Sequence, residues 1–332
     1  MKHKPLSSKG FTIGIDLGGT KMLTVLLDKK NRVRAEVKVK TRVDKGKKYF
    51  IDAILESVRE VLRDGRVTLK EIKALGIGCP GIIDVRTGTV AYSPNIPFLK
   101  NFSLGGSIKK ALGVTVALEN DVNAGLYGEY CFGAAKKACH AVGIFLGTGI
   151  GGALIFDGKL YRGATGAAGE VGHMAMASDG PLCGCGKQGC FEALASRSSV
   201  AAEAALLAGR QQAPHLFDEA GTDLAKIKSG LLAKALKEGD SAIKDLIVRK
   251  STTVGRMMAN LVNLLSPDTI VLGGGLVEAM PERIVKAASE AMHEFAMPQL
   301  AAHVQVLPAE LGDYAIVMGA AELAREKRRV RA

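Results

Sequence analysis

The spacing of hydrophobic positions in the N-terminal part of the chain changes from a strand-like to a helix-like period. Thr12 to Ile15, Met22 to Leu27 and Arg32 to Lys40 predict three strands, the last from its alternation of valine and charged residues. Their short connections favour an antiparallel meander. Apolar side chains recur at helical spacing between Phe50 and Leu62, and Ala74 to Gly78 then predicts a buried strand that ends at a Cys-Pro-Gly turn. The chain therefore switches to strand and helix alternation.

The opening pattern occurs again in the middle of the chain. An apolar strand from Val114 to Leu118 and a helix to about Tyr130 come first. The second occurrence consists of the strand Val142 to Leu146, the turn Gly147 to Gly152, the strand Ala153 to Phe156 and an Asp157-Gly158 hairpin turn. It parallels the segment from Ile13 to Asp28. This duplication predicts two similar lobes, each with a glycine turn facing a cleft between them.

The C-terminal half reads mainly as helices. Leu194 to Leu265 predicts several of them, interrupted around Gln211 to Gly221. Thr269 to Leu272 predicts a strand that ends in three glycines. Ile316 to Arg325 predicts a terminal helix, in which the small residues from Gly319 to Ala321 allow another element to approach closely.

Composition and charge narrow the class of protein. The chain has 332 residues, of which 47% are hydrophobic and 23% charged, so a compact two-domain protein is expected and disorder is excluded. Its formal net charge of +12 favours anionic ligands, nucleic acid or acidic membranes. The basic residues cluster from Lys29 to Lys48 and near the C-terminus, without the interleaved aromatic side chains of a base-stacking surface. We therefore expect solvated basic faces and no nucleic-acid or membrane partner.

The N-terminal residues and the longest apolar stretch indicate the cellular compartment of the protein. Residues 1–10 lack the apolar core of a secretory signal. The longest apolar stretch, from Ala141 to Phe156, is shorter than the roughly 20 residues of a spanning helix and is broken by glycines. We expect a cytoplasmic protein, whose cysteines are thiols or metal ligands before they are disulfides.

Two glycine turns are candidates for phosphate binding. In the first, Asp16 to Lys21, glycines expose backbone N–H groups beside a carboxylate suited to Mg²⁺ and the hydroxyl of Thr20. The alternative is an ordinary tight hairpin. The second turn, Gly147 to Gly152, has no carboxylate but repeats the pattern. Because each turn precedes a strand, neither is a P-loop nor a dinucleotide-binding motif.

Asp121 is a candidate general base. It follows Asn120 where a strand ends and a helix begins, so an alternative role is a helix N-cap or first-turn acid. Phosphoryl transfer needs a group that accepts the proton of the attacking hydroxyl, and a carboxylate near two phosphate turns fits that need.

One histidine and three cysteines form the strongest local pattern. They are His173, Cys183, Cys185 and Cys190. This set satisfies the tetrahedral preference of a structural Zn²⁺ and leaves no open position for catalysis. A disulfide with a spare thiol and an iron–sulfur cluster are the alternatives. The remaining cysteines are expected to be buried thiols: Cys79, Cys131 and Cys139.

Glu170 and Glu192 flank this metal pattern. A rigid metal loop would hold both carboxylates as acceptors for sugar hydroxyls, although two solvated acids would have the same spacing.

The run from Gly166 to His173, followed by CxCGxxGCxE from Cys183 to Glu192, carries a family resemblance. With these motifs the chain resembles the ROK family of bacterial sugar kinases and sugar-responsive repressors, and most closely its glucokinases, from Asp16 to about Ala321. The resemblance implies an α/β fold of the two-lobed, actin-like ATPase type, a duplicated ribonuclease H-like fold with a cleft between the lobes. We expect a small lobe of residues 1–119 and 314–332 and a large lobe of residues 120–313.

The resemblance also implies a set of site residues, with ATP, Mg²⁺ and structural Zn²⁺ as cofactors. Asp121 is implied as catalytic base. The implied sugar contacts are Asn95, Asn120, Asp121, Glu170, His173 and Glu192. The implied nucleotide contacts are Asp16, Gly18, Gly19, Thr20, Lys21, Gly147, Thr148 and Gly149, with adenosine near Gly273, Gly274 and Gly275. His173 would hold zinc with one ring nitrogen and meet the sugar with the other, and a homodimer is implied.

We expect an ATP-dependent kinase for the 6-hydroxyl of a hexose, with glucose as the first candidate. Kinases of N-acetylmannosamine, N-acetylglucosamine or fructose are alternatives, because Leu99 stands where many family glucokinases carry tryptophan. A sugar-sensing repressor is a second alternative, although the residues before Asp16 are too few for a winged helix-turn-helix. An actin-like ATPase acting on a protein would leave the polar cluster around His173 without a purpose.

Overall fold

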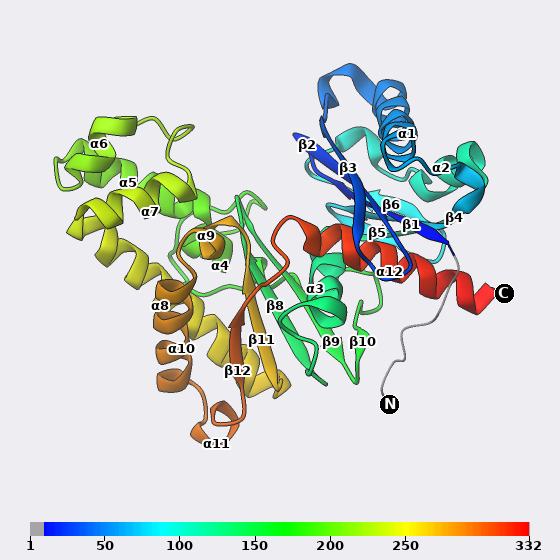
Figure 1. Cartoon of the computed structure of the whole chain (residues 1–332). Coiled ribbons are helices and arrows are strands. Elements are labelled where there is room, and N and C mark those ends of the chain that lie inside the picture. The colour runs from blue at the N-terminus through cyan, green and yellow to red at the C-terminus, as the bar shows by residue number, and fades with distance from the viewer. Residues whose placement is uncertain (1–9, 332) are drawn as a thin grey trace. The chain divides into compact units, whose positions relative to one another are not determined.

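The computed structural model describes residues 10–331, which form two compact units (Figure 1). Unit 1 contains the described residues up to Gly133, the segment Arg162–Ala168 and the chain from Asp313 onward. Unit 2 contains Ala134–Tyr161 and Gly169–Gly312. The first boundary lies at Gly133, whereas the sequence placed it after residue 119. Helix α3 (Asp121–Phe132) belongs to unit 1 because it packs along the C-terminal helix α12 (Tyr314–Arg331).

Unit 1 is built on a five-stranded sheet in the order β3-β2-β1-β4-β7. Its strands are β1 (Phe11–Leu17), β2 (Lys21–Leu27), β3 (Val33–Lys40), β4 (Ile72–Cys79) and β7 (Thr115–Asn120). The first three strands form the expected antiparallel meander, while β4 and β7 run parallel to β1. A separate hairpin is formed by β5 (Ile82–Asp84) and β6 (Thr89–Tyr92).

Helices cover both faces of this sheet. On one face, α1 (Gly46–Gly65) and α2 (Leu104–Leu112) join a core with the inward side chains of β1, β4 and β7. On the other face, Val317 and Ala321 of α12 pack against β2. The approach is close, since a Cβ on Gly76 of β4 would lie 1.9 Å from the carbonyl oxygen of Ala320. A Cβ on Gly319 would lie 1.8 Å from the carbonyl oxygen of Ala124, so the expected close approach at Gly319 to Ala321 is confirmed.

Unit 2 repeats the topology with the strand order β10-β9-β8-β11-β12. Its strands are β8 (Ala141–Leu146), β9 (Ile150–Phe156), β10 (Lys159–Leu160), β11 (Thr269–Gly273) and β12 (Gln305–Pro308). Strands β8, β9 and β10 are antiparallel, and β11 is parallel to β8. The prediction of a turn from Gly147 to Gly152 was too long. The buried Ile150 pairs with Leu146, so β9 starts there and the turn is Gly147 to Gly149.

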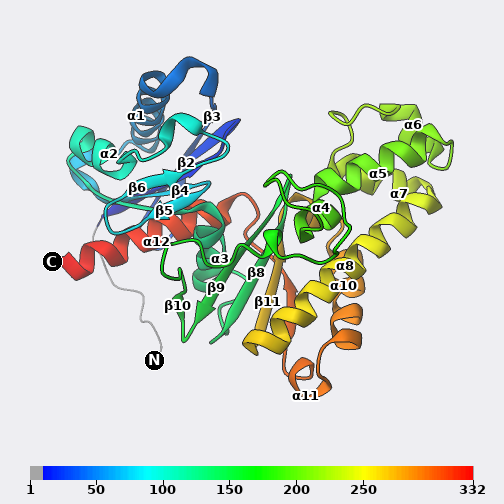
Figure 2. The same ribbon diagram turned by 180° about the vertical axis from the view of Figure 1, so that it is seen from behind.

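The α-helices of unit 2 follow β10 and precede β12 in the sequence. They are α4 (Phe191–Ala195), α5 (Arg197–Gly209), α6 (Pro214–Ala220), α7 (Ser229–Glu238), α8 (Ser241–Leu265), α9 (Gly275–Ala279), α10 (Pro281–Phe295) and α11 (Pro298–Ala301). Helices α8 and α10 lie side by side (Figure 2). The predicted interruption at 211–221 was wrong in part, because α6 lies within it. Pro214 starts this helix and the burial of Leu216 and Ala220 holds it in place.

Two further expectations concern membranes and cysteines. Within residues 10–331 no helix is long and apolar enough to cross a membrane. The expectation that residues 1–10 carry no secretory signal falls almost entirely outside the described residues. All six cysteines are free thiols, of which Cys79 is buried, Cys131 half-buried and Cys139 exposed. The prediction of a buried thiol was therefore wrong for Cys139, which lies in the turn that precedes β8.

Candidate active site

Three parallel strands of unit 1 bring their carboxyl ends to one place. Asp16 on β1 pairs with Gly78 on β4, and Gly78 pairs with Glu119 on β7. Asp121 follows directly as the first residue of α3. The register thus carries Asp16 and Asp121, which are far apart in sequence, into electrostatic contact.

The carboxyl group of Asp16 has an unusual environment. Burial, followed by the nearby charge of Asp121 and a contribution from Asp313, raises the pKa of Asp16 to about 7, against a smaller opposing effect of Lys21. A divalent cation would relieve this repulsion, and carboxylate oxygens are ligands that Mg²⁺ takes. The residues present therefore fit the expected Mg²⁺ near Asp16.

The two residues at the start of α3 have different roles. Asn120 is the N-cap, since its Oδ1 accepts a hydrogen bond from the backbone N–H of Asn123 at 3.0 Å. Its Nδ2 donates to the carbonyl oxygen of Gly81 at 3.1 Å, in the Cys-Pro-Gly turn. Asp121 is the first helical residue, and its Oδ1 accepts from the N–H of Val122 at 3.0 Å. The N-cap position thus belongs to Asn120. The other alternative, a first-turn acid, is met by Asp121, which lies at the positive end of the helix.

An ion pair missed by the sequence analysis supports this strand end. Glu119 is buried, and its Oε2 accepts hydrogen bonds from Nε and Nη2 of Arg162 at 2.8 and 2.7 Å. Its Oε1 accepts from the N–H of Asn120 and from Nδ2 of Asn123, both at 3.1 Å. The one sequence signal was a charged residue closing an apolar strand. Glu119 therefore fixes the backbone from which Asn120 and Asp121 project.

The first glycine turn also contains the expected neighbours. The N–H of Gly18 donates to the carbonyl oxygen of Lys21 at 3.0 Å, which closes a tight turn between β1 and β2. A Cβ on Gly19 would lie 3.2 Å from Cβ of Asn95, so the structure brings Asn95 against this turn. Thr20 is exposed at its tip. The turn can offer backbone N–H groups and a hydroxyl to a phosphate.

The second glycine turn is held by the start of α5. The N–H of Gly147 donates to the carbonyl oxygen of Gly149 at 2.9 Å. Nη2 of Arg197 donates to Oγ1 of Thr148 at 2.7 Å, and Oγ of Ser198 donates to the carbonyl oxygen of the same residue at 2.7 Å. These contacts order the turn and leave Thr148 exposed.

Glu192 connects the second turn to the cysteine loop. Its Oε2 accepts from the N–H of Ile150 at 2.8 Å, and its Oε1 lies 3.6 Å from Sγ of Cys183. A Cβ on Gly149 would lie 2.2 Å from Oε2 of Glu192, so glycine leaves room for this carboxylate. The sugar contact expected of Glu192 stays a prediction.

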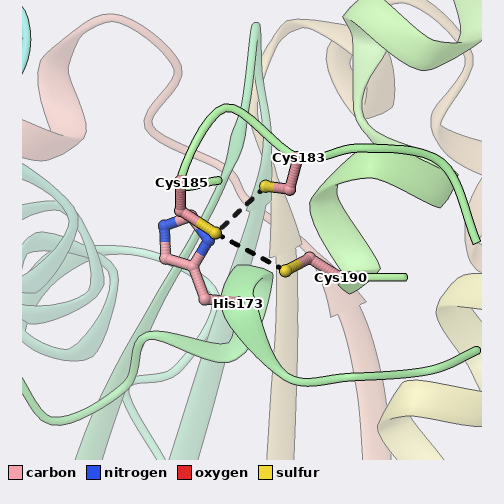
Figure 3. Close-up of side chains that lie close together, drawn as sticks. All are labelled: His173, Cys183, Cys185 and Cys190. Carbon is pink, nitrogen blue, oxygen red and sulfur yellow. Dashed lines mark hydrogen bonds between the residues drawn. The ribbon is translucent and has the colours of Figure 1, made fainter. Parts of the chain in front are cut away.

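The four residues predicted as zinc ligands converge in unit 2, as Figure 3 shows. Their ligand atoms all lie within 4.8 Å of one another. Sγ of Cys185 is 3.7 Å from Sγ of Cys190, and Sγ of Cys183 is 3.8 Å from Nδ1 of His173. Tetrahedral zinc with Zn–S bonds of about 2.3 Å places sulfur atoms about 3.8 Å apart, whereas a disulfide needs about 2.05 Å. The cluster fits zinc and contains no disulfide.

His173 and Glu170 are brought together by a 3₁₀ turn, η4 (Val171–His173). Nε2 of His173 lies 4.0 Å from Oε2 of Glu170, while Nδ1 faces Cys183. Both side chains are about half exposed. Nδ1 is therefore the nitrogen suited to the metal, which leaves Nε2 and the Glu170 carboxylate on the solvent side.

Comparison with known proteins identifies the family. The ROK family profile matches residues 12–327. The chain belongs to the ROK family. It is 33% identical over 315 residues to the glucokinase of Thermotoga maritima, with 95% of this chain and 97% of that protein covered. It is 30% identical to the N-acetylmannosamine kinase of Vibrio cholerae, with 93% and 98% covered.

A solved ROK structure is similar along the whole chain. The ROK family glucokinase from Streptomyces griseus, determined in complex with glucose and AMPPNP, superposes with a TM-score of 0.83 at 33% identity. The match covers 96% of this chain and 100% of that one. The expected fold class, the two-lobed actin-like ATPase type, is thereby confirmed.

The three glycines predicted to lie near adenosine are found at the end of β11 and directly after it. Gly273 pairs with Phe145 of β8, and a Cβ on it would lie 2.6 Å from that ring. Gly274 has a φ of 85° and lies against the backbone of Leu146. Since β8 leads into the second glycine turn, Gly273 to Gly275 and that turn are neighbours in unit 2.

The predicted site residues thus form one group in each unit. In unit 1 the strand ends and the first turn gather Asp16, Gly18, Gly19, Thr20, Lys21, Asn95, Asn120 and Asp121. In unit 2 the second turn, the cysteine loop and the end of β11 supply Gly147, Thr148, Gly149, Glu170, His173, Glu192 and Gly273 to Gly275.

Proposed function

We propose that this ROK protein is an ATP-dependent hexose kinase that phosphorylates the 6-hydroxyl of glucose. The observation that carries the proposal is the position of Asp121 at the N-terminus of α3, in electrostatic contact with Asp16 and in the same unit as the first glycine turn. The similarity to glucokinases over most of the chain supports the same activity. We place the enzyme in the reducing cytoplasm, where its thiols remain free, and expect it to be a homodimer.

In the proposed reaction, Asp121 accepts the proton of the sugar 6-hydroxyl. The hydroxyl oxygen forms a bond to the γ-phosphorus of ATP while the bond from that phosphorus to the β–γ bridging oxygen breaks, which releases ADP. The backbone N–H groups of the two glycine turns bind phosphate oxygens. Bound Mg²⁺ neutralises phosphate charge, and Asp16 is the residue that would hold it.

The cysteine loop has a supporting role in this proposal. His173, Cys183, Cys185 and Cys190 would hold a structural zinc, which supplies rigidity and no reaction step. With Nδ1 of His173 committed to the metal, Nε2 carries the ring proton and can donate to a sugar hydroxyl. Glu170, 4.0 Å from Nε2, can accept from another hydroxyl.

Leu99 does not argue against glucose. A leucine in place of tryptophan at this position widened the expected substrate range. Leu99 lies in a 3₁₀ turn (Pro97–Leu99) with a fully buried side chain that belongs to the core of unit 1. The side chain of Leu99 therefore packs in this core.

A panel of sugars with ATP and Mg²⁺, followed by ADP release, tests the proposal. We expect glucose to give a higher kcat/KM than fructose, N-acetylglucosamine or N-acetylmannosamine, because a site that pairs sugar hydroxyls rejects analogues that leave its polar groups unpaired. The product should be the 6-phosphate. Equal or better turnover of an N-acetylated sugar or fructose would overturn the glucose assignment and leave the kinase in place. Glucose binding without ADP release for any sugar would favour the sugar-sensing regulator instead.

A further inference from the structure

A second cluster of metal-binding side chains lies in unit 2, apart from the His173 loop in sequence. Cys139, His140 and Asp157 place one ligand atom each within 4.8 Å of the others. Nε2 of His140 is 3.6 Å from Oδ1 of Asp157. Cys139 and Asp157 are exposed and His140 is partly exposed, so an ion in solution has access to all three.

The backbone that carries these side chains is fixed by several hydrogen bonds. The N–H groups of Cys139 and His140 both donate to Oδ2 of Asp268, each at 2.7 Å. The N–H of Gly158 donates to the carbonyl oxygen of Cys139 at 3.0 Å, which docks the β9–β10 hairpin tip onto the start of β8. Asp157 sits at that tip with a φ of 50°. The backbone of the cluster is therefore held in place before any ion binds.

The donor set points to a borderline transition metal. Thiolate, imidazole and carboxylate are the three ligand types of Zn²⁺, whose tetrahedral ligand atoms lie about 3.3 to 3.8 Å apart. Nε2 of His140 and Oδ1 of Asp157 already have this separation. Rotation of the exposed Cys139 and Asp157 side chains brings Sγ of Cys139 to the same separation from the other two ligand atoms. Three protein ligands leave the fourth position to water, unlike the closed set at His173.

We propose that Cys139, His140 and Asp157 form a second metal site, which binds Zn²⁺ or a similar divalent ion with one water-accessible position. Binding releases the thiol proton of Cys139. It also puts the ring proton of His140 on Nδ1 when Nε2 binds the ion, so the long 3.4 Å hydrogen bond from the N–H of Asp157 to Nδ1 is given up. Because the site is exposed, it binds more weakly than the His173 cluster.

Cobalt titration of the protein as purified tests this site. Co²⁺ bound to a thiolate absorbs strongly, and elemental analysis of the same samples reports any zinc retained at the His173 cluster. We expect one equivalent of Co²⁺ to bind beyond the metal already present, with a thiolate-to-cobalt band. His140→Gln and Asp157→Asn should each weaken this binding by about tenfold or more, and Cys139→Ser should abolish the band.

The controls are His303→Gln and Asp52→Asn, two substitutions at exposed residues outside the cluster. Both should bind the added cobalt like the unaltered chain. The proposal is overturned if the unaltered chain takes up no further cobalt, or if the three cluster variants bind it as tightly as the controls. An emptied His173 cluster would bind cobalt through its own cysteines. Elemental analysis is therefore used to compare samples of equal zinc content.

Discussion

At the scale of single residues, Asp16 is the carboxyl group of the candidate site whose pKa is strongly raised. Its pKa in the folded chain is about 7, whereas an unfolded aspartate titrates near 3.8. The folded state therefore binds more protons than the unfolded state between about pH 4 and 7, and stability falls as the pH rises through this window.

We expect Asp16→Asn to remove this pH dependence. In magnesium-free buffer, the stability of the unaltered chain relative to the variant should fall between pH 4 and 7. The limit is roughly 4 kcal/mol, because the pKa of Asp16 rises from 3.8 to about 7 on folding. Urea unfolding across this range measures the difference, with Asp52→Asn as an exposed control. Parallel pH profiles for Asp16→Asn and the unaltered chain would contradict the raised pKa.

The individual site residues were predictable to different degrees. The predicted zinc ligands Cys183, Cys185 and Cys190 lie so close in sequence that spacing alone indicated a cluster, which the structure shows. The exposure of Cys139 was not predictable, because a thiol between two apolar segments has the same pattern whether it closes a turn or enters a core.

At the scale of elements, the junction of β7 and α3 depends on the ion pair between Glu119 and Arg162. The pair links residues 43 positions apart, and no local pattern could reveal it. Asp121 depends on this junction, since Glu119 binds the N–H of Asn120.

Arg162→Ala should destabilise the protein by about 3 kcal/mol, because it leaves the buried Glu119 carboxylate without a charge partner. Chemical denaturation measures the loss, and Arg162→Ala combined with Glu119→Gln should recover part of it. The matched control is Arg42→Ala, whose exposed pair with Asp44 should matter far less. An effect of Arg162→Ala no larger than that of Arg42→Ala would refute the structural role.

The cysteine loop is a second such element, and its order is expected to depend on bound zinc. Freshly purified protein should contain about one zinc per chain at His173, Cys183, Cys185 and Cys190, since structural sites contribute on the order of 10 kcal/mol of apparent binding free energy. Strong chelators should increase hydrogen exchange in residues 173–190, while Cys131→Ala should keep its zinc. Absence of zinc from protein prepared without chelator would rule out this structural metal.

At the scale of the whole molecule, the duplicated topology was predictable and the boundary between the units was not. Both sheets start with an antiparallel meander around a glycine turn, and this repeat was visible in the apolar pattern. The boundary depends on the packing of α3 against α12, a contact between segments nearly 200 residues apart, as in the hydrogen bond from Tyr127 to Glu326. Such pairing is decided by tertiary packing.

The turnover of Asp121→Asn tests the central claim most directly. Both proteins are given glucose, ATP and Mg²⁺, ADP release is followed, and glucose binding is measured separately by calorimetry. Because the amide keeps the shape of the side chain and loses its basicity, kcat should fall by about 10² to 10⁴ while glucose binding and the fold are retained. A near-normal kcat in the variant would contradict the assignment of Asp121 as the base that accepts the sugar proton.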